Sequence, residues 1–287
     1  MEIREYQNSA DFLRKAEAFL MENEAENNLI LGQATRLARG ETTGSSPSIF
    51  YAVEEDGRVL AAAMHTPPYR LVLTRGPGPA IATIADYAAR KKVDLAGVIG
   101  PQEPVTMFTR AWNKLSRDKI KNGHRLRIYQ LENLKPPPPA SGTLEPATPR
   151  DLDLLHQWNI AFTKAVEQPL TGNERTMAER SIKEGRLFIW KDPHPVSMAA
   201  WAGPTPRGVR INMVYTPPEF RRRGYASAAV STLTKRLLDS GRKFCFLYTD
   251  LGNPTSNKIY QQMGYQPVCD ITEIDFERFF SPRLTCD

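Results

Sequence analysis

Four consecutive prolines, Pro136 to Pro139, interrupt this 287-residue chain close to its midpoint. Proline has no backbone N–H group and its φ angle is fixed, so a run of prolines does not fit inside a helix or a central strand. Such a run favours an extended polyproline segment between two folded parts. We therefore predict a linker at residues 135–142, an N-terminal domain at 1–134 and a C-terminal domain at 143–287, each of ordinary domain size.

The composition is that of a globular protein, because 41% of the residues are hydrophobic and 24% are charged. No apolar run reaches the roughly 20 residues needed to span a bilayer. The charged N-terminal residues 1–12 do not resemble a signal peptide. The net charge of +6 is spread over short clusters without interleaved aromatic residues, which argues against nucleic acid as a partner. We expect a cytoplasmic protein that binds neither membranes nor nucleic acids.

Cysteine and histidine are too few and too scattered to predict a metal site or a Ser-His-Asp arrangement. The three cysteines, Cys245, Cys269 and Cys286, have no metal-ligand spacing. Cys245 stands in an apolar, strand-like run, and we interpret the cysteines as core thiols. No metal cofactor is expected.

Both halves of the chain show a similar alternation of helices and strands. In the second half, helical spacing covers about 149–165, 173–184, 225–239 and 254–263, and strand patterns cover 186–191, 196–202, 210–215 and 244–249, with closing strands through 276. In the first half, a helical stretch at 9–39, with a possible break near Gly32, precedes a hairpin around Asp56-Gly57 and further helices at 80–91 and 105–115. The pattern predicts an α/β fold with a mixed, mostly antiparallel central sheet flanked by helices in each half, and suggests an internal duplication.

A basic turn with one glycine joins an apolar strand to a helix in the second half. Arg221, Arg222 and Arg223 precede Gly224, and the helix follows directly from Tyr225. Backbone N–H groups in such a turn converge at the positive end of the helix dipole, which creates an anion site. Glycine lets the backbone approach the anion, and arginine forms charge-assisted bonds to phosphate. The turn lacks the Gly-Lys-Ser/Thr of a Walker A loop, and the alternative is an ordinary exposed basic turn.

Two motifs at suitable spacing resemble one known family. The stretch from Arg221 to Ala226 is similar to the Gln/Arg-x-x-Gly-x-Gly/Ala signature with which GNAT acyltransferases bind the pyrophosphate of coenzyme A. The stretch from Asn253 to Tyr260 resembles the Asn-x-x-x-x-x-Tyr-like segment that lies beside the cofactor in that family. The resemblance covers most of residues 143–276. Together with the similar order of elements in the first half, it implies two GNAT-like domains in tandem. The cofactor-binding residues that it implies are Met213, Val214, Tyr215, Arg221, Arg222, Arg223, Gly224, Tyr225, Ala226, Ser227, Asn253, Asn257 and Tyr260.

The resemblance also implies a reaction, in which a primary amine attacks the thioester of acetyl-CoA directly. A backbone N–H of residues 213–215 would stabilise the oxyanion, and Tyr260 would protonate the departing thiolate as the catalytic acid. Many relatives carry a glutamate base on the strand before the phosphate loop, where this chain has Asn212, Met213 and Val214. Asp250, Glu219 and a chain of water molecules remain open as the base.

The acceptor is left open as a small-molecule or peptide amine. In the GNAT family the loop between the first two helices and the closing strands select the acceptor, which here means 162–176 and the region after Val268. Phe162, Glu167 and Trp201 either line that pocket or, for the aromatic residues, pack in the core. Two alternative functions are a longer-chain acyl-CoA N-acyltransferase and a non-catalytic CoA-binding sensor or scaffold. The chain is expected to be a monomer or a homodimer.

The first half offers a poorer phosphate loop. If the halves are duplicates, its counterpart runs from Arg75 to Ala80, with one arginine and two prolines that have no N–H to offer an anion. The helix after Pro101 contains Phe108 and Trp112 but no tyrosine in a position like that of Tyr260. We therefore predict that the N-terminal half is a GNAT-like domain without cofactor binding, which packs on the catalytic half and walls the acceptor site.

Overall fold

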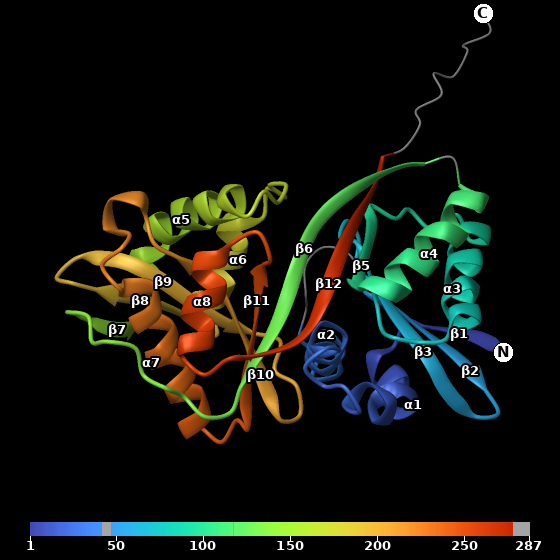
Figure 1. Ribbon diagram of the computed structural model, residues 1–287, viewed down its shortest axis with the longest axis horizontal. Helices are drawn as coiled ribbons and strands as arrows, with labels where there is room; N and C mark the ends of the chain where they lie inside the picture. Colours follow the sequence, from blue (N-terminus) through green and yellow to red (C-terminus); the bar gives the residue numbers. More distant parts are fainter. Residues whose placement is uncertain (42–46, 117, 278–287) are drawn as a thin grey trace, which may run out of the picture. The chain divides into compact units, whose positions relative to one another are not determined.

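A computed structural model describes residues 1–41, 47–116 and 118–277, so that Cys286 lies outside the described residues. The chain divides into two compact units, whose elements are labelled in Figure 1. Unit 1 contains Met1–Ile128, Asp250–Gly252 and the described residues from Val268 onward, and unit 2 contains Tyr129–Thr249 and Asn253–Pro267. The sequence-based boundaries differ from this division, because the proline run lies inside unit 2 and the last strand belongs to unit 1.

Unit 1 combines a sheet with two pairs of helices. Its strands are β1 (Glu2–Tyr6), β2 (Ile49–Glu55), β3 (Arg58–His65), β4 (Leu71–Leu73) and β5 (Gly97–Pro101), with most of β6 (Lys119–Leu131) and β12 (Gln266–Glu277). Its helices are α1 (Ser9–Met21), α2 (Asn28–Ala38), α3 (Gly78–Arg90) and α4 (Gln102–Leu115). The strand order is β1-β2-β3-β4-β5-β12-β6, and β4 and β5 are parallel neighbours.

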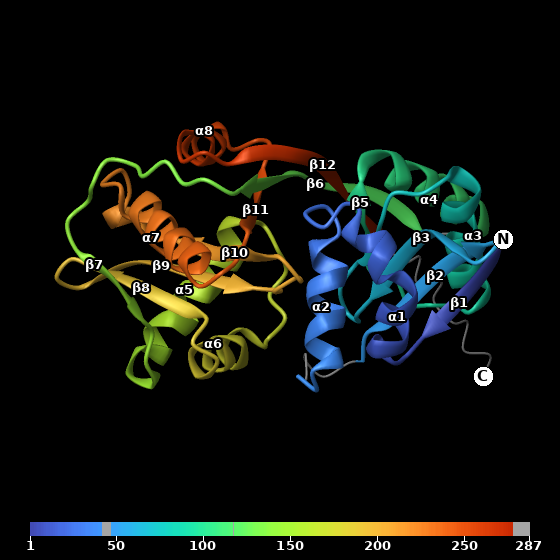
Figure 2. The ribbon, with the colours of Figure 1, turned by 90° about the horizontal axis from the view of Figure 1, so that it is seen from below.

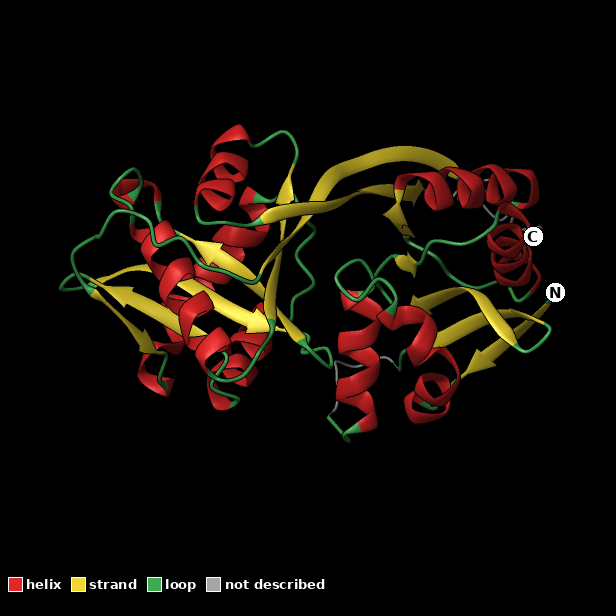
Figure 3. Ribbon diagram, turned by 60° about the horizontal axis from the view of Figure 1, so that its bottom comes forward, coloured by secondary structure: helices red, strands yellow, loops and turns green. Residues whose placement is uncertain are grey.

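Unit 2 repeats this arrangement of strands and helices (Figure 3). Its strands are β7 (Thr143–Pro146), β8 (Leu187–Lys191), β9 (Pro195–Ala202), β10 (Gly208–Tyr215) and β11 (Phe244–Asp250), and the end of β6 joins them. Its helices are η1 (Pro149–Asp151), α5 (Leu152–Ala165), α6 (Glu174–Lys183), η2 (Pro218–Phe220), α7 (Tyr225–Asp239) and α8 (Pro254–Gln262). The strand order is β6-β11-β10-β9-β8-β7. The mixed α/β fold with a mostly antiparallel sheet is therefore confirmed.

Helices cover both faces of the sheet in unit 2. Successive side chains of a strand point to opposite faces, so one strand contributes to a buried cluster on each face. On one face, Leu233 of α7 packs in the same buried cluster as Ile211 of β10. On the other face, Trp158 of α5 is buried with Met198 and Ala200 of β9. The sheet of unit 2 is thus the central layer between α7 and α5.

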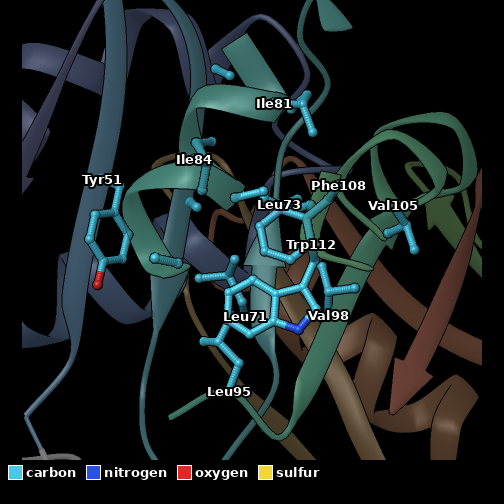
Figure 4. Close-up of a cluster of buried hydrophobic side chains, with 14 of the residues drawn as sticks. Tyr51, Leu71, Leu73, Ile81, Ile84, Leu95, Val98, Val105, Phe108 and Trp112 are labelled. Carbon is cyan, nitrogen blue, oxygen red and sulfur yellow. The ribbon is translucent and has the colours of Figure 1, made fainter. Parts of the chain in front are cut away.

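The core of unit 1 is completed by the last strand of the chain. Figure 4 shows Phe108 and Trp112 of α4 beside residues of the β4 and β5 strands, and their rings stack with centroids 5.9 Å apart. Phe276 of β12 stacks on Trp112 at 5.5 Å. Burial of such aromatic rings is a large apolar contribution, so β12 is part of the folded core of unit 1.

The helical stretch at 9–39 breaks at a different place from the one expected. The interruption lies at residues 22–27, between α1 and α2, whereas Gly32 is buried in the middle of α2. The amide nitrogens of Asn27 and Asn28 donate to the carbonyl oxygens of Leu20 and Ala25, at 3.0 and 2.6 Å. Asparagine side chains compete in this way with the backbone bonds of a helix. The prediction of a break near Gly32 was wrong for this reason.

Other local signals are confirmed. Asp56 and Gly57 form a two-residue turn between β2 and β3 with φ angles of 50° and 77°, as expected for this dipeptide in a hairpin. At the start of the first helix of unit 2, the backbone N–H and the hydroxyl of Thr148 both donate to the carboxylate of Asp151, at 2.8 and 2.7 Å. These hydrogen bonds form a capping-box-like start of the helix.

None of the described helices has both the length and the apolarity to cross a membrane. Among the same residues, no group of three or more His, Cys, Asp or Glu side chains is placed to hold a metal ion. Cys245 is fully buried, which raises the pKa of its thiol to about 12. Cys269 is half-buried, and burial likewise raises its pKa to about 12. These two thiols stay protonated at neutral pH, as expected of core cysteines.

Candidate active site

The strands β10 and β11 of unit 2 part along their length. Their parallel pairing covers Gly208 to Arg210 on β10, opposite Phe244 to Phe246 on β11. Strand β10 then continues to Tyr215 and β11 to Asp250 without a further pair. The backbone groups on this edge of β10 beyond Arg210 therefore have no strand partner on β11. Such an edge offers N–H and C=O groups to an extended ligand.

A bulge lies in β10 where the two strands have parted. Asn212 faces Ala200 of β9, and the next pair joins Tyr215 to Met198, so that β10 has one extra residue. Met213 has a φ angle of 51°. A left-handed conformation costs a non-glycine residue about 1 to 3 kcal/mol and is concentrated at functional sites. Met213 packs in the cluster on the α5 face and Val214 in the cluster on the α7 face.

Asn212 stands immediately before the left-handed residue of this bulge. Its carboxamide oxygen is buried and has no hydrogen-bond partner among the described residues. An unsatisfied buried acceptor costs about 1 to 3 kcal/mol, and it is retained where a ligand or water completes the bond. In the sequence, Asn212 is only one of three residues that stand where relatives carry a glutamate. The structure adds it to the candidate site.

The turn before α7 leaves its donors available. Arg222 and Gly224 have φ angles of 63° and 82°, and no side chain caps α7. The N–H groups of Tyr225, Ala226 and Ser227 form the first turn of this helix, where an α-helix has no internal acceptors for them. The predicted loop is thus the uncapped N-terminus of a 15-residue helix, and it has the geometry of an anion site.

The three arginines of the loop are exposed but differ in their contacts. The Nε of Arg221 donates to the carbonyl oxygen of Thr216 at 3.0 Å, which fixes the turn. Arg222 and Arg223 form no ion pair with the described residues, and both remain available to a phosphate.

Tyr225 anchors the loop through its side chain. Its hydroxyl donates to the carboxylate of Asp192 at 2.6 Å, and the hydroxyl of Ser141 donates to the same oxygen. These hydrogen bonds, from Ser141 first and from Tyr225 second, lower the pKa of Asp192, and the charge of Arg223 lowers it further. The tyrosine ring is buried, so its side chain positions the loop and only its N–H faces the anion site. No sequence signal points to Asp192, because its partners lie far away in the sequence.

Helix α8 carries the second motif, and its three predicted residues have different contacts. Asn253 is the N-cap, with its side chain accepting from the N–H of Ser256 at 3.0 Å. The side chain of Asn257 donates to the carbonyl oxygen of Asn253 at 2.7 Å and accepts from the hydroxyl of Tyr129 at 2.9 Å. The side chains of Asn253 and Asn257 therefore stabilise the start of α8 and its contact with Tyr129. No sequence signal points to Tyr129, which lies 128 residues from Asn257.

Tyr260 is half-buried on α8, with its ring in an edge-to-face contact with Tyr265 at 5.8 Å. Its hydroxyl has no hydrogen-bond partner among the described residues. Burial raises the pKa of Tyr260 to about 12. A phenol with this pKa keeps its proton at neutral pH and is able to donate it.

The residues proposed for the base and for acceptor selection do not assemble into one group. Asp250 accepts from the N–H of Gly252 at 2.6 Å and lies 3.4 Å from His124, in unit 1. Phe162 packs against the cluster on the α5 face, whereas Trp201 packs against the cluster on the α7 face. These two aromatic residues therefore lie on opposite faces of the sheet and belong to the core.

The phosphate-loop counterpart in unit 1 is closed. The Thr74 hydroxyl accepts from the N–H of Ala62 at 2.9 Å, which keeps this segment on β3. A Cβ atom at Gly100 would lie 2.7 Å from the carbonyl oxygen of Leu73, so β4 and β5 stay in contact. Arg75 forms an ion pair of 2.8 Å with the buried Glu26. This segment offers neither a parted pair of strands nor an unpaired arginine.

The chain is similar to one known protein family and to several solved structures. Residues 189–273, which include β10, the loop and α8, match the family described as FR47-like protein. No curated protein sequence matches the chain. Among solved structures, an acetyltransferase of the GNAT family from Colwellia psychrerythraea is 12% identical, with a TM-score of 0.62 over 96% of this chain and 99% of that chain.

Two further solved structures also match the chain over both units. A GCN5-related N-acetyltransferase from Sphaerobacter thermophilus is 16% identical, with a TM-score of 0.61 over 96% of this chain and 95% of that chain. A tandem GNAT protein from the clavulanic acid biosynthesis pathway is 13% identical, with a TM-score of 0.55 over 95% of this chain and 97% of that chain. The chain has the tandem GNAT fold. At these identities the matches establish the fold, and the chemistry of this chain has to be argued from its own residues.

Proposed function

We propose that unit 2 is an acetyl-CoA-dependent N-acetyltransferase that acts on a primary amine of a small molecule or peptide. One observation carries the proposal. Strands β10 and β11 part after Arg210 and Phe246, beside the uncapped N-terminus of α7. This arrangement offers an unpaired strand edge to an amide-containing arm and a set of N–H donors to a pyrophosphate, which are the two chemical parts of coenzyme A next to its thiol.

The residues present fit such a donor. The amides of the pantetheine arm would pair with the free edge of β10 at Met213, Val214 and Tyr215, as in the addition of a strand to a sheet. The pyrophosphate would accept from the first turn of α7, and Arg222 and Arg223 would neutralise its charge. The orphaned oxygen of Asn212 lies at the bulge of the same strand, where it would accept a hydrogen bond from an amine.

Acyl-CoA supplies an activated thioester, and the protein supplies orientation and a proton. Tyr260 would give its proton to the departing thiolate, since its hydroxyl has no competing partner among the described residues. Asn212 is a neutral amide, so it would orient an amine but has no basic group with which to deprotonate it. The base remains unassigned, with Glu219, which is exposed in η2, and water as the candidates in unit 2.

The replacement of a carboxylate by Asn212 favours one second function, a CoA-binding protein without transferase activity. A thiol-release assay with acetyl-CoA against a library of primary amines separates the two. The transferase proposal expects amine-dependent release of free CoA that is slowed about ten- to a thousandfold in Tyr260→Phe. Tight binding of acetyl-CoA without release for any amine would favour the sensor or scaffold. Release that occurs only with longer acyl-CoA donors would favour the longer-chain acyltransferase.

A further inference from the structure

The proline-rich segment, residues 135–142, forms part of unit 2 and has no helix or strand. We call it the proline strap. Figure 2 shows the chain between β6 and β7 passing α8 and α7. Three of its four prolines, Pro136, Pro138 and Pro139, are exposed, and Pro137 is half-buried. The run of prolines predicts a spacer between domains, and the contacts of the strap give it a place beside the candidate site.

Both ends of the proline strap are tied to other elements of unit 2. At its start, the N–H of Lys135 donates to the carbonyl oxygen of Met263 at the end of α8, at 2.9 Å. At its end, the indole N–H of Trp190 donates to the carbonyl oxygen of Ser141 at 2.8 Å. Gly142 fits so closely that a Cβ atom would lie 2.2 Å from the carbonyl oxygen of Lys191. The strap is therefore held in one place rather than free to move as a linker.

The end of the strap borders the phosphate loop. A Cβ atom on Gly224 would lie 3.7 Å from the Cβ atom of Ala140. Ser141 and Tyr225 share the carboxylate of Asp192. Consecutive residues of a chain are at most about 3.8 Å apart at Cα, so Pro138 and Pro139 are within two residues of the contact with the loop. The exposed prolines Pro138 and Pro139 are thus one or two residues along the chain from the contact with the phosphate loop.

We propose that Pro138 and Pro139 form the surface on which the adenine base of the acyl-CoA donor rests. The inference depends on the proposed function. Proline has no N–H group, so this part of the strap offers apolar ring faces and no competing donors to the phosphate. A donor whose pyrophosphate lies at the N-terminus of α7 continues on one side into pantetheine and on the other into adenosine. The pantetheine side would lie along β10. The adenosine side would then lie away from β10, against the proline strap.

The fixed φ angles of the prolines add to this surface. A segment that is rigid before binding loses little conformational entropy when the ligand arrives. Because these prolines donate no hydrogen bonds, they can be replaced without the loss of a backbone donor. A double variant, Pro138→Ser with Pro139→Ser, therefore tests the surface while Lys135 and Ser141 still hold the ends.

The experiment compares two donors by calorimetry. Acetyl-CoA contains the adenosine part, whereas S-acetyl-4′-phosphopantetheine ends at the first phosphate. We expect the double variant to raise the Kd of acetyl-CoA about fivefold, which corresponds to about 1 kcal/mol, and to leave the Kd of the shorter donor within about twofold. The matched control is Pro206→Ser, an exposed proline in the turn at the opposite end of β10, which should change neither Kd.

The outcomes separate this inference from the proposed function. Wild-type protein that binds neither donor would overturn the proposed function, and the inference with it. Wild-type protein that binds acetyl-CoA, with an unchanged Kd in the double variant, would overturn the inference alone. An equal rise in Kd for both donors would also overturn the inference, because the strap would then act only by supporting the phosphate loop. Circular dichroism and the melting temperature show whether the variants are folded.

Discussion

The hydroxyl group of Tyr129 donates a hydrogen bond of 2.9 Å to the carboxamide oxygen of Asn257. Tyr129 is fully buried near the end of β6, and its oxygen also accepts from the side chain of Gln261 at 3.3 Å. One strand residue thus contacts two side chains of α8, on either side of Tyr260 in the sequence. The hydrogen bonds fix the helix that carries the proposed catalytic acid.

Removal of this hydroxyl should destabilise unit 2. Tyr129→Phe keeps the ring but leaves Asn257 without its donor, and a typical buried hydrogen bond contributes about 0.5 to 1.5 kcal/mol. We expect a loss of unfolding free energy in that range from urea denaturation, with an unchanged m value. The control is Tyr87→Phe, whose hydroxyl donates to Glu5 at an exposed position of unit 1. A Tyr129→Phe variant as stable as this control would show that the hydrogen bond contributes nothing to folding.

Gly224 should be required for donor binding because of its backbone conformation. Its φ angle is 82°, and the nearest contact of an added Cβ atom is the ordinary one to Ala140. Glycine is therefore required at position 224 for its left-handed backbone conformation, in addition to the room that it leaves for a phosphate. A side chain with a β-branch at this angle distorts the turn, and we expect Gly224→Val to raise the Kd of acetyl-CoA at least about tenfold, or 1.4 kcal/mol.

Gly241 offers the matched control for this substitution. It follows the other end of α7, also has a positive φ angle of 96°, and has open space around it. Gly241→Val should destabilise the fold to a similar degree without a change in donor affinity. If calorimetry gave the same Kd for both folded variants, the assignment of the phosphate loop would be lost.

Tyr260→Phe should separate catalysis from binding. The substitution removes only the hydroxyl, which has no partner among the described residues, and keeps the ring against Tyr265. We expect kcat to fall by about ten- to a thousandfold, with little change in the KM for acetyl-CoA. The measurement is steady-state thiol release, and Tyr6→Phe in unit 1 serves as the control. A wild-type kcat would mean that the thiolate leaves unaided or takes its proton from another acid.

The pH dependence of the reaction should reflect the raised pKa of Tyr260. A general acid has to be protonated, so the rate that depends on it falls as the pH rises through its pKa. Burial raises this pKa to about 12, whereas an unperturbed tyrosine titrates near 10. We expect kcat, corrected for background thioester hydrolysis, to show no decline from this group between about pH 9 and 10.5. A decline with an apparent pKa near 10 that disappears in Tyr260→Phe would contradict the prediction.

The intact chain should bind one equivalent of acetyl-CoA. Unit 1 has prolines in its loop, a contact between Gly100 and Leu73 that closes its strands, and an Arg75 already paired with Glu26. Calorimetry on the whole protein should therefore give a stoichiometry of one, and Arg222→Ala with Arg223→Ala should weaken that single event. A fragment of residues 1–135 is unsuitable for measuring binding to unit 1 alone, because it lacks Phe276 and the rest of β12, which complete the core of that unit. Two equivalents in the wild type would mean that both units bind.

The sequence by itself determined the features that depend on neighbouring residues. The turn at Asp56-Gly57, the helix start at Thr148 and the N-cap at Asn253 follow from the conformations and hydrogen bonds of a few adjacent residues. The strand, basic turn and helix around Gly224 are local in the same sense. Local signals of this kind act through φ preferences and short-range hydrogen bonds, so they are visible without the rest of the fold.

Only the tertiary structure decided which distant segments meet. Tyr129 reaches Asn257 across 128 residues of sequence, Asp192 joins Ser141 to Tyr225, and Phe276 completes the core of unit 1. A strand pattern shows which face of a strand is buried but carries no information on which strand lies beside it. The parting of β10 from β11, and the place of the proline strap beside the phosphate loop, therefore followed from strand pairing and packing rather than from the residues of those segments alone.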